Sequence, residues 1–130
     1  MRRMLWPAPA ALALLLLTAC APATTGPSPS LAPPSSEIAI GLTEWDIVTG
    51  TAQAAAGEVR LLVTNAGATD HDLVVSGIGG TWATPELAPG EEYELLITAS
   101  GGETLELDCS LTGHHAQGMY AELAVAMPGE

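Results

Sequence analysis

Apolar residues alternate with polar or smaller ones in short runs along most of the chain after residue 37. Alternation over about four to eight residues is typical of β-strands that bury one face. Turn-forming pairs separate the runs, among them Thr49-Gly50, Pro89-Gly90 and Gly101-Gly102. The alternating apolar positions are Ile38, Ile40 and Leu42; Val59, Leu61 and Val63; Leu73 and Val75; Leu95 and Ile97; Leu105 and Leu107; and Leu123, Val125 and Met127.

Many short strands at this spacing predict an all-β domain, either a Greek-key β-sandwich or a barrel. No segment after residue 37 has a helical period, although residues 51–56 would fit one short turn. A chain of 130 residues has room for one such domain. Because large rings on a small β-domain are more often core than surface residues, we expect Trp45 in the core, while Trp82 fits either the core or a partner contact.

The first residues have the features of an export signal. Arg2 and Arg3 precede an apolar run over residues 10–17, which is too short to span a bilayer. Leu17-Thr-Ala-Cys20 then resembles a bacterial lipobox, in which cleavage leaves a lipid-bearing Cys at the new N-terminus. We therefore predict a lipoprotein signal peptide over residues 1–19 and lipidation of Cys20. The alternative is an ordinary signal peptide with Cys20 near the cut by chance.

Residues 20–36 are rich in Pro, Ser, Thr and Ala and cannot bury enough apolar surface to fold. We expect this segment to be a linker between the lipid and a folded domain over residues 37–130. The protein would then be extracytoplasmic and anchored to a bacterial membrane, on the periplasmic side or at the cell surface. We expect it to be a monomer.

The charge of the chain is strongly acidic. Loss of residues 1–19 would leave Arg60 against fifteen Asp and Glu residues, a formal charge of −14. Nucleic-acid binding is excluded on this composition, because phosphate contacts need Lys and Arg. An acidic surface suits a basic protein partner and speeds encounter with it. Solubility in an acidic or salty environment explains the charge equally well.

Four residues with metal-binding side chains occur in a suggestive order: His71, Cys109, His114 and Met119. Strand alternation places His71 on the face of Leu73 and Val75, and Cys109 on the face of Leu105 and Leu107. Met119 is in phase with the last apolar run, and His114 lies in the loop between Cys109 and Met119. The sequence therefore predicts one thiolate, two imidazoles and a thioether at one end of the domain.

This donor set is typical of a blue-copper site, since soft sulfur and imidazole together favour copper. Zinc also binds Cys and His, but the thioether argues for copper. Without its signal peptide and with Cys20 lipidated, the protein keeps Cys109 as its single thiol, so no intrachain disulfide can form. Metal ligation would protect a lone thiol in an oxidising compartment.

These residues resemble the cupredoxin family over residues 37–127. Asn65-Ala-Gly-Ala-Thr-Asp-His71 resembles the family's strand, turn and first histidine, and Pro89-Gly-Glu resembles the lead-in to the metal loop. Cys109-x₄-His114-x₄-Met119 is most similar to the loops of rusticyanin, sulfocyanin and auracyanin. The resemblance implies a cupredoxin-like fold and one copper ion, with His71, Cys109 and His114 as strong ligands and Met119 as a weak axial ligand.

Asp72 departs from the pattern of the family, and His115 is a histidine outside the predicted ligand set. Asp72 replaces the Asn or Ser that often follows the first histidine, and its carboxylate could still accept a backbone N–H and would lower the reduction potential. His115, next to a ligand, is expected to point toward solvent. It is a candidate for the partner surface, a competing ligand, or a solvated residue without a role.

The predicted function is a membrane-anchored electron carrier with one copper that cycles between Cu(II) and Cu(I). Its redox partners would be a cytochrome or a respiratory complex. The rival is a copper-binding or delivery lipoprotein that exchanges metal without carrying electrons. An enzyme is not expected, because copper oxidases and nitrite reductases need a second copper centre and the chain has three His in all.

Overall fold

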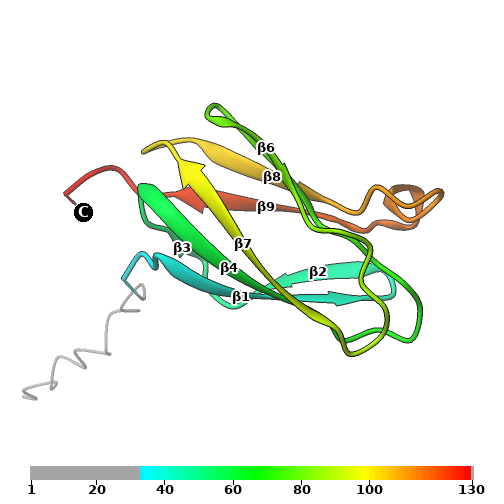
Figure 1. Ribbon diagram of the computed structural model, residues 1–130. Helices are drawn as coiled ribbons and strands as arrows, with labels where there is room; N and C mark the ends of the chain where they lie inside the picture. The colour runs from blue at the N-terminus through cyan, green and yellow to red at the C-terminus, as the bar shows by residue number, and fades with distance from the viewer. Residues whose placement is uncertain (1–32, 130) are drawn as a thin grey trace, which may run out of the picture. The chain divides into compact units, whose positions relative to one another are not determined.

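A computed structural model describes residues 33–129, which form two facing β-sheets (Figure 1). One sheet has four strands in the order β2 (Asp46–Thr49), β1 (Glu37–Thr43), β4 (Gly57–Asn65) and β7 (Glu92–Ala99). The other has five, in the order β3 (Gln53–Ala54), β9 (Tyr120–Val125), β8 (Thr104–Asp108), β5 (Val74–Gly77) and β6 (Gly80–Ala83).

Both sheets are mixed. β1 pairs with β4, and β3 with β9, in parallel, while the other neighbouring strands are antiparallel. The predicted all-β sandwich is confirmed. Two details differ from the sequence analysis: residues 53–54 form the short strand β3, in a segment that would also fit one helical turn, and Met127 lies beyond the end of β9 and is exposed.

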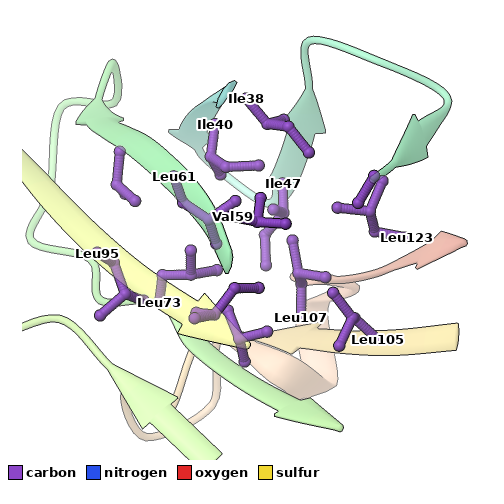
Figure 2. Close-up of a cluster of buried hydrophobic side chains, with 14 of the residues drawn as sticks. Ile38, Ile40, Ile47, Val59, Leu61, Leu73, Leu95, Leu105, Leu107 and Leu123 are labelled. Carbon is purple, nitrogen blue, oxygen red and sulfur yellow. The ribbon is translucent and has the colours of Figure 1, made fainter. Parts of the chain in front are cut away.

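The core lies between the sheets and is aliphatic. Figure 2 shows Ile and Leu side chains from both sheets meeting there, including Leu61 of β4 and Leu107 of β8. The alternation seen in the sequence produces it: on β4, Val59, Leu61 and Val63 are fully buried, while the residues between them face outward. Period-two patterning therefore assigns each strand its buried face.

The two tryptophans take different places. The expectation that Trp45 belongs to the core is wrong, because it lies in the turn between β1 and β2 and is 39% exposed. Trp82, on β6, is half-buried and packs against the core.

The predicted signal peptide and Cys20 lie outside the described residues. Within residues 33–129, no helix is long and apolar enough to cross a bilayer. The one helical element there is the short 3₁₀ helix η1 (His115–Gln117), in the loop between β8 and β9. In Figure 1 this loop lies at the same end of the sandwich as the turn between β1 and β2.

Truncation of Leu61 to Ala should cost about 2–5 kcal/mol of unfolding free energy, because a fully buried side chain leaves a cavity between the sheets. The adjacent Leu62 is 38% exposed, so Leu62→Ala should change stability by less than about 1 kcal/mol. Urea unfolding of both variants measures the difference. Equal losses would contradict the assignment of buried and exposed faces on β4.

Candidate metal centre

The four predicted ligand positions come from two connected segments at one end of the sandwich. His71 precedes β5 and forms a two-way backbone bridge with Leu87, at N···O distances of 3.1 and 2.7 Å. Cys109 directly follows β8, and Met119 directly precedes β9. The Cys109 N–H donates to the Met119 carbonyl at 3.2 Å, so the β8–β9 pairing closes the loop that carries His114.

The donor atoms of three of these residues converge. The Nδ1 atoms of His71 and His114 are 3.2 Å apart, and Cys109 Sγ lies 3.4 Å from His114 Nδ1. All three donor atoms lie within 4.8 Å of one another. Met119 is fully buried, and its N–H donates to the His114 carbonyl at 3.2 Å.

This donor set fits a single copper ion. A thiolate and two imidazoles within reach of one ion, with a buried thioether residue next to them, suit copper in both oxidation states. Zinc accepts Cys and His ligands, but a structural zinc site usually has four strong ligands. The described residues offer three strong ligands in this group, and the residue placed to be a fourth ligand is Met119.

Burial of Cys109 explains why the group needs a cation. Removal from water is the main cause that raises the pKa of this thiol, and the nearby Asp72 carboxylate raises it further. The backbone N–H groups of Asp72 and Leu111 act in the opposite direction. Without metal the thiol is therefore protonated at neutral pH, and a bound metal would displace the proton and hold the thiolate.

The outer nitrogen of His71 has a partner that the sequence did not reveal. Its Nε2 lies 3.0 Å from Oε1 of Glu44, in the turn between β1 and β2. Backbone and hydroxyl hydrogen bonds from Thr69 are the largest causes that lower the pKa of this carboxyl to about 2, and His71 and Ala68 contribute. No local pattern links a turn carboxylate to a histidine 27 residues away.

Asp72 connects the two ligand-bearing segments, as its position in the sequence suggested. Its Oδ1 accepts the backbone N–H of Ser110 at 2.7 Å, and its Oδ2 accepts the Ser110 hydroxyl. Ser110 follows Cys109 directly. The bond therefore links the residue after the first histidine to the residue after the cysteine.

Asn65, at the end of β4, holds the loop that leads into His71 through side-chain hydrogen bonds. Its amide donates to the carbonyls of Thr69 at 2.8 Å and of Leu87 at 2.7 Å, and its Oδ1 accepts the Gly67 N–H at 2.9 Å. The side chain is fully buried. The sequence indicates Asn65 only as part of a turn, because its hydrogen-bond partners lie on two separate loops.

Trp45 contacts both histidines at their edge. Its ring lies 4.8 Å from that of His114 and 6.3 Å from that of His71, both in T-shaped arrangements. Such geometry is favourable for aromatic rings. The residue expected in the core thus lines the metal centre and remains partly open to solvent.

His115 is directed away from the donor group. Its Nδ1 lies 2.7 Å from Asp108 Oδ1, and its ring stacks on Tyr120 at 5.1 Å. Its side chain is 65% exposed, as expected from the sequence. The adjacent histidines therefore occupy different environments because the 3₁₀ turn sends consecutive side chains to different sides.

Replacement of Asn65 by Ala should lower the unfolding free energy of the metal-free protein by about 1–3 kcal/mol, since the carbonyls of Thr69 and Leu87 would each lose the hydrogen bond from this buried amide. Thr64→Ala, at the neighbouring half-buried position, should cost less than about 1 kcal/mol. Chemical denaturation compares the two. A loss at Asn65 no larger than at Thr64 would mean that water replaces the amide without cost.

Neither a family model nor a curated protein matches the chain by sequence. Solved structures match it in three dimensions. Reduced auracyanin from Roseiflexus castenholzii superposes with a TM-score of 0.59 at 20% identity, covering 72% of this chain and 99% of that chain.

Two further structures match with similar coverage. Auracyanin A, a "blue" copper protein from Chloroflexus aurantiacus, gives a TM-score of 0.55 at 18% identity, covering 68% of this chain and 97% of its own. Azurin from Methylomonas sp. strain J gives 0.53 at 15% identity, covering 68% and 96%. At these identities the likeness establishes the fold. The described part of the chain is a β-sandwich of the cupredoxin fold, and its Cys-His₂ group, with Met119 adjoining, fits a single copper ion.

Proposed function

We propose that this protein carries single electrons on one copper ion, held by His71, Cys109 and His114 with Met119 as the weak axial ligand. The observation that supports it best is the convergence of donor atoms from His71, Cys109 and His114 within 4.8 Å of one another at one end of the sandwich. The neighbouring structures that share the fold include an auracyanin described as a "blue" copper protein.

A fixed geometry is what the chemistry of electron transfer requires. Cu(II) and Cu(I) prefer different arrangements of ligands, and a site that holds an intermediate one changes little when the electron moves. The ligand residues are bound to one another through backbone hydrogen bonds and through Asp72. These bonds support a site that resists rearrangement.

The protein would work outside the cytoplasm, held to a bacterial membrane by lipid on Cys20. Residues 20–36 would tether the copper domain, which would shuttle as a monomer between a donor and an acceptor such as a cytochrome or a respiratory complex. The acidic charge favours a partner with a basic surface. No catalytic role is proposed, since one copper centre uses two of the three His in the chain.

Copper delivery is the second candidate, because the same ligands could hold and release metal. A delivery site exchanges its ion and is usually open, whereas His71, Cys109 and Met119 are each no more than 1% exposed. Among residues 33–129, no second group of three His, Cys, Asp or Glu side chains could hold a metal. Both points favour the electron carrier.

Addition of Cu(II) to the purified protein should produce an intense thiolate-to-copper charge-transfer band that reductant bleaches reversibly. Cys109→Ser should abolish the band because the thiolate is lost, and His114→Ala should weaken or shift it. His115→Ala is the matched control and should leave the band unchanged, since His115 lies outside the donor group. Visible and EPR spectra measure these effects. Weak d–d bands in the unaltered protein, or copper removed by mild chelators, would favour delivery or no copper site.

Asp72→Asn should raise the reduction potential, because a negative charge beside the ligand segments favours Cu(II) over Cu(I). Asn keeps an oxygen that can accept the Ser110 N–H, so the fold should survive. A tenfold change in preference corresponds to about 59 mV for one electron. Redox titration measures the shift, and an unchanged potential would exclude an effect of this charge.

A further inference from the structure

We propose that Glu44 is a positioning residue for the copper centre: it orients the His71 ring from outside and, through its charge, shifts the centre toward Cu(II). This inference rests on the proposed copper function. It starts from the 3.0 Å contact between Glu44 Oε1 and His71 Nε2, on the side of the ring opposite the donor atom Nδ1.

The carboxylate is held firmly in place. Its Oε1 accepts the backbone N–H groups of Ala68 and Thr69 and the hydroxyl of Thr69, each at 2.9 Å, in addition to facing His71. These donors belong to the loop that leads into His71. The contact therefore joins the β1–β2 turn to the segment that positions the buried histidine.

The chain leaves no room for a side chain beside this contact. A Cβ added at Gly67 would lie 2.6 Å from Glu44 Oε1 and 2.8 Å from His71 Nε2. Close approach of the backbone thus shields the carboxylate–imidazole pair on one side. Glycine is required at this point for steric reasons, since its φ is not in the left-handed region.

The contact decides which ring nitrogen carries the proton. An ionised carboxylate can only accept, so a neutral imidazole facing it must hold its proton on Nε2. Nδ1, 3.2 Å from His114 Nδ1, is then the nitrogen with the free lone pair. Carboxylates that bind the outer nitrogen of a metal-ligating histidine fix its orientation and increase its basicity in this way.

Among residues 33–129, the Glu44 carboxylate has no cationic side chain beside it other than His71. Arg60 is the sole Lys or Arg within residues 33–129, and it pairs with Glu37 and Glu94, each at 3.5 Å. A carboxylate bonded to a ligand of the metal stabilises the more positive ion, which is Cu(II). Because 28% of the Glu44 side chain is exposed, water screens part of this effect.

Three variants separate the charge from the hydrogen bond. Glu44→Gln keeps an oxygen for the four donors and removes the charge. Glu44→Ala removes both. Asp46→Asn is the matched control, because it removes an exposed carboxylate two residues from Glu44, at the start of β2, without contact to a ligand. Redox titration should show that Glu44→Gln moves the Cu(II)/Cu(I) preference toward Cu(I) about tenfold, or about 59 mV, while Asp46→Asn moves it less than twofold.

A second readout needs no copper. Nitrogen-15 NMR of the metal-free protein should show His71 with its proton on Nε2 in the unaltered chain and in Glu44→Gln. In Glu44→Ala the ring should populate both tautomers. Equal potentials for Glu44→Gln and Asp46→Asn would overturn the role of charge, and an unchanged tautomer in Glu44→Ala would overturn the role in orientation. If the unaltered protein forms no copper–thiolate band, the proposed function fails, and the NMR result alone decides whether Glu44 orients His71.

Discussion

The structure depends on a buried thiol and a buried imidazole that meet a half-buried imidazole at one end of an acidic β-sandwich. Their donor atoms are 3.2–3.4 Å from their nearest neighbours in the group. Arg60, the single Lys or Arg of residues 33–129, is engaged on the four-stranded sheet. A metal cation is the natural charge to hold the thiolate there, because an uncompensated buried charge is costly.

The scaffold achieves this arrangement by satisfying polar groups around the donors. Asn65 satisfies carbonyls on the two loops that flank His71, and Asp72 binds the residue after Cys109. Glu44 performs a similar role from the β1–β2 turn. In residues 33–129 no buried side-chain nitrogen or oxygen lacks a partner. Such a network restrains the ligand side chains independently of the metal.

The ligand side chains on the core side of the site are buried, whereas those on the outer side are partly exposed to solvent. His71, Cys109 and Met119 are buried, whereas His114 is half-buried and lies against the partly exposed ring of Trp45. His115 turns outward, where it contacts Asp108 and Tyr120 on the outer surface of β8 and β9. His114 and Trp45 are therefore the residues of this group that lie nearest to solvent.

Much of this could be predicted from the sequence. Alternation of Val59, Leu61 and Val63 assigned a buried face because side chains in a strand alternate strictly, and the same rule placed Cys109 inside. The sequence was enough to group Cys109, His114 and Met119, because one loop carries all three residues. Asp72 could be singled out because it is adjacent in sequence to a predicted ligand, and its effect on the reduction potential stays a prediction. Tertiary structure alone decided the positions of Glu44 and Trp45. A turn has no repeating pattern of apolar residues from which its neighbours could be predicted. Their contacts with His71 and His114 exist only because strand pairing brings the β1–β2 turn to the end of the sandwich where the ligand loops meet.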